Sequence, residues 1–366
     1  MKTLRRFLYK EILTAVAFVT VAFLALFFFF DFVDELRWVG HSATGAYTVS
    51  AALMMVALAI PNHLYELLPI TVLIGTIFVM ARLAQSSEFT IMRTSGLGPW
   101  KALRTLLVLG LGFVVLTFAV GDYVAPLTER ASQLLKARTQ GSITMGHTGA
   151  WLKERQPSNI FFVNVGALTG RGEMRSVHIF EFGDHGLVST TRAERGQVGQ
   201  DGHWELASVE RNQYQVRQEP PRIERQNLPE FRWATGITAD MVSASLLKPD
   251  TMRTIDLFQY IRHLNANDQT SQKYEIEFWR KVFYPLSCLV MVVLALPFAY
   301  LHFRSGGIAT YVFGGVMAGI SFFLLNNVFG YIGNLQNWAP WLTAAAPGLI
   351  YSALSLAAFG WLVLRR

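Results

Sequence analysis

One short stretch of the sequence combines residue types and spacing that indicate a function: LAQSSEFTIMRTSGLGP, residues 83–99. It holds a single acid, Glu88, directly after two serines, and it ends at glycines and a proline, which stop helices. A serine can cap the start of a helix, and an acid in the first turn suits the positive end of the helix dipole. The stretch predicts a helix over about 84–95, capped by Ser86 or Ser87 and stopped by Gly96 and Gly98-Pro99. Helical spacing predicts one shared face for Ala84, Ser87, Glu88, Ile91, Met92 and Ser95, with Phe89 and Arg93 on the neighbouring stripe.

The spacings that enzymes use for chemistry are absent from the sequence. It has no G-x-x-x-x-G-K-[ST] phosphate loop, no G-x-S-x-G turn and no H-E-x-x-H metal motif. The eight histidines are scattered and the single cysteine, Cys288, lies in an apolar run, so we predict no metal site and no disulfide. Glu66, Asp122 and Lys281 lie near the ends of apolar runs, which argues against an ion relay. We therefore expect a non-enzymatic protein without a cofactor of its own, and if it does work, the energy comes from a partner.

The elements around this stretch are apolar and long. The chain has 366 residues, of which 52% are hydrophobic and 16% charged, and its mean hydropathy is +0.32. Residues 12–30, 282–301 and 305–364 carry no charged side chain, and about 20 apolar residues suffice to cross a membrane. These values indicate a multi-pass membrane protein rather than a soluble one.

The hydropathy pattern predicts six membrane-spanning helices in two groups of three. Their approximate ranges are 11–33, 62–82, 102–124, 281–302, 307–331 and 341–363. Residues 46–60 are apolar but too short for a comfortable span, and Pro61-Asn62-His63 follows them. We predict an interfacial helix there, or an extension of the second span.

The distribution of basic residues predicts the orientation, because lysine and arginine collect in short cytoplasmic loops. With six spans, only Arg37 lies in a short outside loop. The inside set has eleven members: Lys2, Arg5, Arg6, Lys10, Arg82, Arg93, Lys101, Arg104, Arg304, Arg365 and Arg366. Both termini and the stretch around Glu88 are therefore expected on the cytoplasmic side of the membrane.

The long segment between the two groups of spans has a different composition and predicts an exported β-domain. Five strands are indicated by alternating apolar residues between turn signals, at 159–165, 176–182, 186–194, 203–210 and 214–218. Residues 128–140 and 252–268 are expected to form helical flanks. The predicted fold is a membrane α-helical protein with six transmembrane helices (3 + 3) and an inserted periplasmic all-β domain, a sandwich or jelly roll. The predicted domains are 1–125, with the helix at 84–95, then 126–278 and 279–366.

Four motifs of this chain resemble the lipopolysaccharide-export permease family. They are FFDFVDELRWVG (29–40), LAQSSEFTIMRTSG (83–96), VGDYVAP (120–126) and EFWRKVFYPLS (277–287). The likeness covers essentially the whole chain and is greater for the LptG type of this LptF/LptG family than for the LptF type. The Ser-Glu pair and the Ser-Gly that follows it are the most specific part.

The resemblance implies a location in the bacterial inner membrane, a set of partners and a mechanism. An LptG-type permease forms a heterodimer with an LptF-type permease, on two LptB-type ATPase subunits, with an LptC-type bitopic protein; nucleic acid is not a partner. Lipopolysaccharide would enter a cavity between spans, and ATP binding by the partner subunit would drive it toward the periplasmic bridge to the outer membrane. By position, contact with the ATPase is assigned to Glu88, Phe89, Met92 and Arg93.

The resemblance also implies substrate contacts, which this sequence matches less closely. The family can place several lysines at the outer end of span one, where this chain has Asp31, Asp34, Arg37 and Trp38. The predicted substrate-binding residues are Arg37, Trp38, Lys136 and Arg138 at the outer ends, and Phe322, Leu325 and Asn326, with Phe329, in a stripe on span five.

Simpler interpretations stay open for each of these residues. Interfacial anchors commonly include residues such as Arg37 and Trp38. A solvated helix face would equally explain Lys136 and Arg138. The stripe on span five could be ordinary packing surface. The helix at 84–95 could be a plain loop helix. Two other functions remain: a lipoprotein-release-type permease driven by an ATPase, although such proteins usually have four spans, and a non-transporting membrane scaffold with a periplasmic β-domain.

Overall fold

The structure is a computed structural model that describes residues 2–40, 47–140, 149–169, 172–183, 186–199, 203–215, 222–238, 241–242, 249–300 and 308–361. The chain divides into two compact units. The helical unit comprises Met1–Asp34, Val56–Thr128 and Gln272–Arg366, and the β unit comprises Glu35–Met55 and Glu129–Ser271.

Six helices are long and apolar enough to cross a membrane, counted over the described part of the chain. These spans are Thr3–Leu36, Val49–Gln85, Pro99–Gln133, Gln272–Tyr300, Ala309–Leu335 and Pro340–Phe359. The six predicted spans are therefore confirmed. The predicted extension of the second span is confirmed from Val49 onward, because helix α2 (Val49–Gln85) continues through Pro61 and Pro69, whereas residue 46 lies outside the described part.

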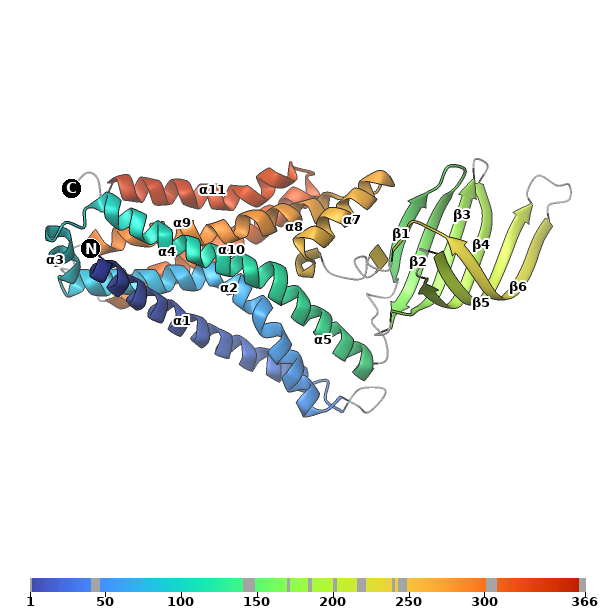
Figure 1. Ribbon diagram of the computed structural model, residues 1–366, viewed down its shortest axis with the longest axis horizontal. Coiled ribbons are helices and arrows are strands. Elements are labelled where there is room, and N and C mark those ends of the chain that lie inside the picture. The colour runs from blue at the N-terminus through green and yellow to red at the C-terminus, as the bar shows by residue number, and fades with distance from the viewer. Residues whose placement is uncertain are drawn as a thin grey trace. The chain divides into compact units, whose positions relative to one another are not determined.

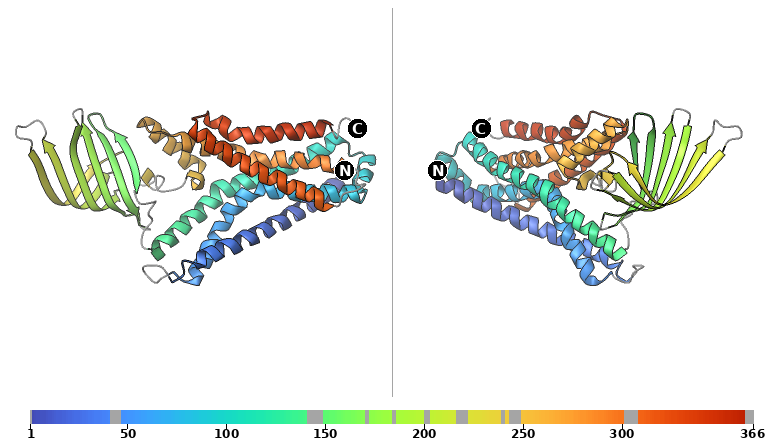
Figure 2. Two further views of the ribbon diagram at one scale, coloured as in Figure 1. Left: turned by 180° about the vertical axis from the view of Figure 1, so that it is seen from behind. Right: turned by 45° about the vertical axis from the view of Figure 1, so that its right-hand side comes forward.

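Over the described residues, all or most of eight α-helices belong to the helical unit (Figures 1 and 2). They are α1 (Lys2–Leu36), α2 (Val49–Gln85), α3 (Glu88–Thr94), α4 (Pro99–Ala119), α8 (Gln272–Phe283), α9 (Ser287–Ala295), α10 (Ile308–Leu335) and α11 (Pro340–Phe359). A π-helical turn, Val120–Val124, joins α4 to α5 (Ala125–Gln140). Short 3-10 turns, Tyr284–Leu286 and Leu296–Tyr300, precede and follow α9.

Small residues let these helices approach one another closely. A Cβ added at Gly75 of α2 would lie 2.8 Å from the backbone of Val16 on α1, and the Thr20 hydroxyl of α1 donates to Thr71 of α2 at 2.9 Å. Gly315 and Gly319 of α10 form a small-xxx-small pair, which permits close packing. Their partner is α2, since added Cβ atoms would lie 2.7 Å from Ile77 and 2.8 Å from Ile70.

The β unit contains one antiparallel sheet whose described strands follow the chain order β1-β2-β3-β4-β5-β6. The strands are β1 (Ala150–Arg155), β2 (Ile160–Leu168), β3 (Met174–Gly183), β4 (Gly186–Val198), β5 (His203–Gln215) and β6 (Arg222–Ala234). The inserted all-β domain is confirmed. Among the described strands each pairs with the next, as in a meander, whereas a jelly roll is defined by Greek-key order.

One face of this sheet is buried. Along β2 the buried residues alternate strictly, from Phe161 to Ala167. Trp204 on β5 is fully buried and donates its indole N–H to the carbonyl of Ile237 at 2.9 Å. Helix α7 (Thr254–Ala266) adds a buried face to this unit, and Asn267 after it accepts a hydrogen bond from the Arg155 backbone at 2.7 Å.

Three details of the strands differ from the prediction. The segment predicted as a fifth strand, 214–218, begins as the end of β5, which runs to Gln215, while residues 216–221 lie outside the described part. Strands β1 and β6 were missed. β6 holds Pro229 and alternates charges of both signs, a composition typical of an edge strand rather than a central one.

Candidate functional site

Helix α3 lies between the second and third spans, where the sequence predicts a helix. Its first residue is Glu88, as expected for an acid in the first turn. The predicted serine cap is wrong: Ser87 adopts a left-handed conformation (φ 60°) and no side chain caps the helix. The predicted stop is correct. Gly96 is left-handed (φ 97°), its N–H reaches the Arg93 carbonyl and the Leu97 N–H reaches the Met92 carbonyl, both at 3.0 Å, which is a Schellman ending.

The buried face of α3 consists of Phe89 and Met92, which are 2% and 8% exposed and belong to the core of the helical unit. The Phe89 ring meets the Tyr300 ring edge-on at 5.1 Å, and the Arg93 guanidinium lies 4.9 Å over the same ring. Glu88 is exposed, and Ile91 is 64% exposed. The predicted shared face is therefore wrong in grouping Met92 with Glu88 and Ile91.

This arrangement assigns different tasks to the four residues predicted to contact an ATPase. Phe89 and Met92 anchor α3 to its own chain, and Arg93 covers Tyr300. Glu88 and Ile91 remain available to a partner. Any coupling role of these residues stays a prediction, with Glu88 as its most accessible polar group.

The outer end of α1 contains the first predicted substrate residues. Arg37 and Trp38 are exposed, Trp38 by 61%. They follow a turn in which the Trp38 N–H donates to the Glu35 carbonyl at 3.1 Å. The Glu35 carboxylate accepts a hydrogen bond from the buried Tyr47 hydroxyl. Burial, and then this carboxylate, raise the pKa of Tyr47 well above its usual value. The turn is thus fixed by neighbours, with Arg37 and Trp38 pointing to its exterior.

The second pair of predicted rim residues lies on α5. Lys136 is exposed, whereas the side chain of Arg138 lies outside the described residues. α5 is tied to α7 by an ion pair between Arg130 and Asp256 at 2.8 Å. Recognition of phosphate by Arg37, Trp38, Lys136 or Arg138 stays a prediction.

Asp31, one of the acids that stand where the family can place lysines, has a partner in the helical unit. Asp31 on α1 contacts Nε2 of His63 on α2 at 2.6 Å, and the His63 ring lies 5.0 Å from the ring of Phe27. The sequence signal was available, since Pro61-Asn62-His63 interrupts an apolar run with polar groups. Asp31 therefore joins two spans.

The predicted stripe on α10 packs against its own chain. Phe322 is 3% exposed, with its ring 5.1 Å from that of Tyr351, and Asn326 is 8% exposed. Leu325 packs against the same cluster. The opposite face carries the exposed apolar side chains, spaced by three or four residues: Phe313, Met317, Ile320, Leu324, Val328, Tyr331 and Leu335. A lipid role for the predicted stripe stays untested, and the exposed face is better placed for contact with lipid.

Ionisable side chains meet between four spans, in an arrangement that the sequence analysis missed. Lys281, 6% exposed, donates to the Gly121 carbonyl of the π-helical turn at 3.3 Å. Arg280 pairs with Glu277 at 2.7 Å and donates to the Asn326 carbonyl of α10 at 3.1 Å. Each residue lies near the end of an apolar run, and no local pattern indicates that these side chains meet.

Tyrosines complete this polar cluster. The Tyr284 hydroxyl donates to the Glu66 carbonyl on α2 at 2.5 Å, and its ring lies 5.1 Å from that of Tyr65. Tyr65 packs directly over Gly121, where any added Cβ would overlap its ring. Buried charges inside a helical membrane protein are costly unless paired, and here the pairing links spans two, three, four and five.

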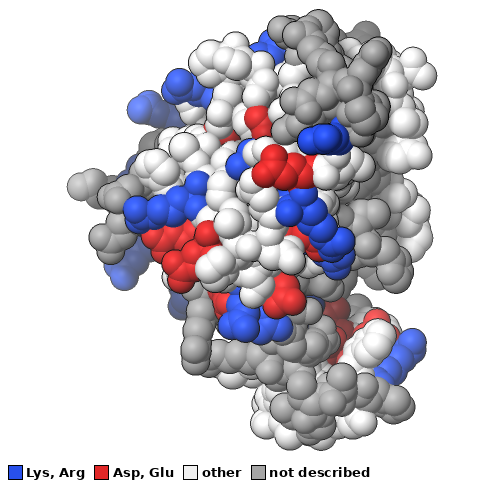
Figure 3. Space-filling model, turned by 90° about the vertical axis from the view of Figure 1, so that its right-hand side faces the viewer, with Lys and Arg blue, Asp and Glu red and all other residues white. Residues whose placement is uncertain are grey.

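Basic side chains do not gather into one patch on the face seen in Figure 3, where acidic and basic side chains are interspersed. Cross-strand ion pairs join Arg225 to Glu210 at 2.5 Å and Arg232 to Glu205 at 3.0 Å. Within the described ranges, no group of three or more His, Cys, Asp or Glu is arranged to hold a metal ion.

Comparisons with known proteins give the family. Residues 6–364 match the family described as "Lipopolysaccharide export system permease LptF/LptG". The chain is 26% identical over 367 residues to the lipopolysaccharide export system permease protein LptG of Escherichia coli K12, covering 99% of this chain and 98% of that protein. It is 28% identical over 368 residues to the LptG protein of Haemophilus influenzae, covering 100% and 99%. The resemblance predicted from the four motifs is thereby confirmed, and the chain belongs to the LptF/LptG family of lipopolysaccharide export system permeases.

Proposed function

We propose that this chain is the LptG-type subunit of a transporter that extracts lipopolysaccharide from the inner membrane and passes it toward the periplasmic bridge. Hydrolysis of ATP belongs to a separate subunit, because the sequence holds no phosphate loop. The proposed assembly contains an LptF-type permease, two LptB-type ATPase subunits and an LptC-type bitopic protein. The family match and the six spans support this proposal.

The observation that carries the mechanism is the way in which α3 packs against the helical unit through its buried residues. A helix of seven residues is too short to be stable alone. This one is held by Phe89 and Met92 in the core of the helical unit, and it presents Glu88 outward. A push on Glu88 from an ATPase would therefore move α3 together with the end of span four through Tyr300.

The proposed orientation puts α3 and both termini in the cytoplasm and the β unit in the periplasm. It rests on the eleven basic residues of the short inside loops against Arg37 outside. Cysteine substitutions at Ser95, Gln197 and Gln336 would test it. A periplasmic thiol reagent should label the last two and not the first. The native Cys288 is fully buried and gives little background.

The proposed path for the lipid uses two kinds of surface, on separate parts of the chain. Acyl chains would contact exposed apolar faces, such as that of α10 defined above. Phosphates and inner-core sugars would meet Arg37, Trp38, Lys136 and Arg138, if these act as the resemblance implies. Charge-assisted hydrogen bonds to phosphate suit arginine and lysine.

Two measurements on the purified complex separate this proposal from its alternatives. A copurifying ATPase would contradict the scaffold alternative. Identification of the bound lipid by mass spectrometry should give lipopolysaccharide, whereas an acylated lipoprotein would favour the lipoprotein-release alternative.

A further inference from the structure

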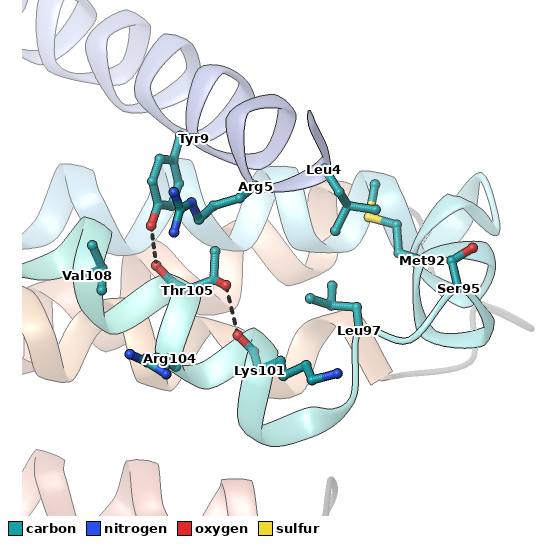
Figure 4. Close-up of a pocket in the computed structure, with 10 residues that line it drawn as sticks. All are labelled: Leu4, Arg5, Tyr9, Met92, Ser95, Leu97, Lys101, Arg104, Thr105 and Val108. Atoms are coloured by element: carbon teal, nitrogen blue, oxygen red, sulfur yellow. Dashed lines mark hydrogen bonds between the residues drawn. The ribbon is translucent and has the colours of Figure 1, made fainter. Parts of the chain in front are cut away.

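A pocket of about 470 Å³ lies where α1, α3 and α4 meet (Figure 4). α1 contributes Arg5 and Tyr9, and α4 contributes Lys101, Arg104 and Val108. The walls are held together, because the Tyr9 hydroxyl donates to the Thr105 carbonyl at 3.1 Å. All of these residues belong to the helical unit.

The polar side of the pocket is cationic. Arg5, Lys101 and Arg104 all line it, and no acidic side chain does. Lys101 donates to the Gly96 carbonyl at 3.2 Å. Over the described residues, neither Arg5 nor Arg104 forms an ion pair. The charge of the pocket is therefore uncompensated within the described part of the chain and favours an anionic ligand.

The other side of the pocket is apolar and continues along α4. Val108 lines the pocket and is 53% exposed. Leu111 follows Val108 by three residues and Val115 follows it by seven, so that all three share one face of the helix, and Leu111 and Val115 are 55% and 63% exposed. An exposed apolar track thus leads away from the three cations along one helix.

The position along the chain matches the depth of lipid headgroups. The charge-free run of α1 begins at Ile12, just after Arg5 and Tyr9, and α4 has no charged residue between Arg104 and its end. Trp100, 66% exposed, lies one turn before Arg104. Basic and aromatic residues at the ends of apolar spans are typical of the membrane interface. The cations therefore lie at headgroup level and the track at acyl-chain level.

From this combination we propose that the pocket binds an anionic glycerophospholipid of the leaflet that faces α3. Arg5, Lys101 and Arg104 bind its phosphodiester, and one acyl chain lies along Val108, Leu111 and Val115. Basic pockets between membrane helices bind such headgroups. Only the assignment to the cytoplasmic leaflet rests on the proposed function. Met92 and Ser95 also line the pocket, so the bound lipid contacts α3 and helps to hold this helix in place.

The test uses the purified full-length chain in detergent and native mass spectrometry with added dioleoyl-phosphatidylglycerol. Dioleoyl-phosphatidylcholine, which has the same acyl chains but no net charge, and inorganic phosphate serve as comparison probes. R5Q/R104Q removes two charges from the pocket. R6Q/K10Q removes two exposed charges from the same end of α1 that do not line it. V108W fills the apolar side without a change of charge.

The proposal predicts binding of phosphatidylglycerol that R5Q/R104Q weakens at least about tenfold, since each cation near a lipid surface contributes roughly 1 kcal/mol. V108W should weaken it as well, and R6Q/K10Q should not. Equal loss in both double variants would mean general surface charge and would overturn the proposal. So would equal binding of phosphatidylcholine, or binding of inorganic phosphate as tight as that of the lipid. Unchanged binding of phosphatidylglycerol by R5Q/R104Q would overturn it too. None of these outcomes depends on lipopolysaccharide export or on orientation.

Discussion

The guanidinium of Arg93 lies 4.9 Å over the ring of Tyr300, the last residue of the fourth span. Phe89, one turn earlier on α3, meets the same ring at 5.1 Å. Two side chains of a seven-residue helix therefore contact the same aromatic ring at the end of a membrane span. This contact is the physical link between a cytoplasmic partner and the spans in the proposed mechanism.

The first prediction concerns the packing of α3 against the helical unit. Phe89→Ala should lower the stability of the purified chain, because removing a large buried side chain leaves a cavity. In a packed core this change lowers the free energy of unfolding by roughly 3–5 kcal/mol. Ile91→Ala on the same helix is the control. It is 64% exposed, so its effect should stay within about 0.5 kcal/mol. Thermal unfolding in detergent measures both, and equal melting temperatures would show that Phe89 does not anchor the helix.

The second prediction concerns the polar cluster. Gly121→Ala should destabilise the chain, because the new methyl group would overlap the ring of Tyr65. Gly112→Ala, on the same span with nothing within 4 Å of the added carbon, should be neutral or slightly stabilising. Tyr65→Leu in the Gly121→Ala background should restore part of the loss. Thermal unfolding of the four proteins checks this, and a harmless Gly121→Ala would rule out the tight contact.

The spans, the inserted sheet and the helix around Glu88 were predictable, because hydropathy and alternation are local signals. The face of α3 was not: seven residues offer more than one face with two apolar members, and Tyr300, far along the chain, selects Phe89 and Met92. The packed side of α10 was not predictable either, for a related reason. That helix is apolar all round, so helical spacing cannot tell its packed side from its exposed side.

The third prediction concerns the outer residues. Replacing Arg37 and Lys136 together by Glu should lower crosslinking of lipopolysaccharide to the transporter, since hydrogen bonds to charged groups contribute roughly 1.5–3 kcal/mol each. Assembly should be intact. Arg175→Glu with Arg195→Glu, two exposed positions on β3 and β4, is the matched control and should have no effect. Unchanged crosslinking in the first pair would make Arg37 an interfacial anchor only.

The fourth prediction concerns pH. Burial lowers the pKa of His263 on α7, against a smaller opposite effect of Glu154, and its Nε2 has no hydrogen-bond partner among the described groups. A lowered histidine pKa means that the unfolded chain binds the proton more readily. The free energy of unfolding is therefore at its full value above about pH 6.5, where His263 is neutral in both states. It decreases as the pH falls below that value, because the unfolded chain then binds a proton that the folded chain resists.

Hydrogen exchange of α7 and β1 in the full-length chain, corrected for intrinsic rates, should show weaker protection at pH 5.5 than at pH 7.5. His263→Gln should reduce this difference. A pH response that stays the same in His263→Gln would assign the effect to another group, such as His178, whose pKa burial also lowers.

The central claim is that Glu88 transmits the motion of the ATPase. A carboxylate that pairs with a basic residue inside an interface is costly to remove, on the order of 3–5 kcal/mol when the pair is fully buried and far less when it is exposed. Glu88→Ala should weaken docking of the ATPase or uncouple hydrolysis from lipid release, and Glu88→Lys should be worse because it brings like charges together. Thr90→Lys, an exposed position on the same helix, controls for added charge.

The most direct measurement is ATP-dependent release of lipopolysaccharide from proteoliposomes that contain the complete transporter with Glu88→Lys. We predict that release fails while the protein still inserts and folds, and that an acidic substitution of the facing basic residue on the ATPase restores part of it. Normal ATPase binding and normal release by Glu88→Lys would contradict this account and leave α3 a loop helix on the membrane surface.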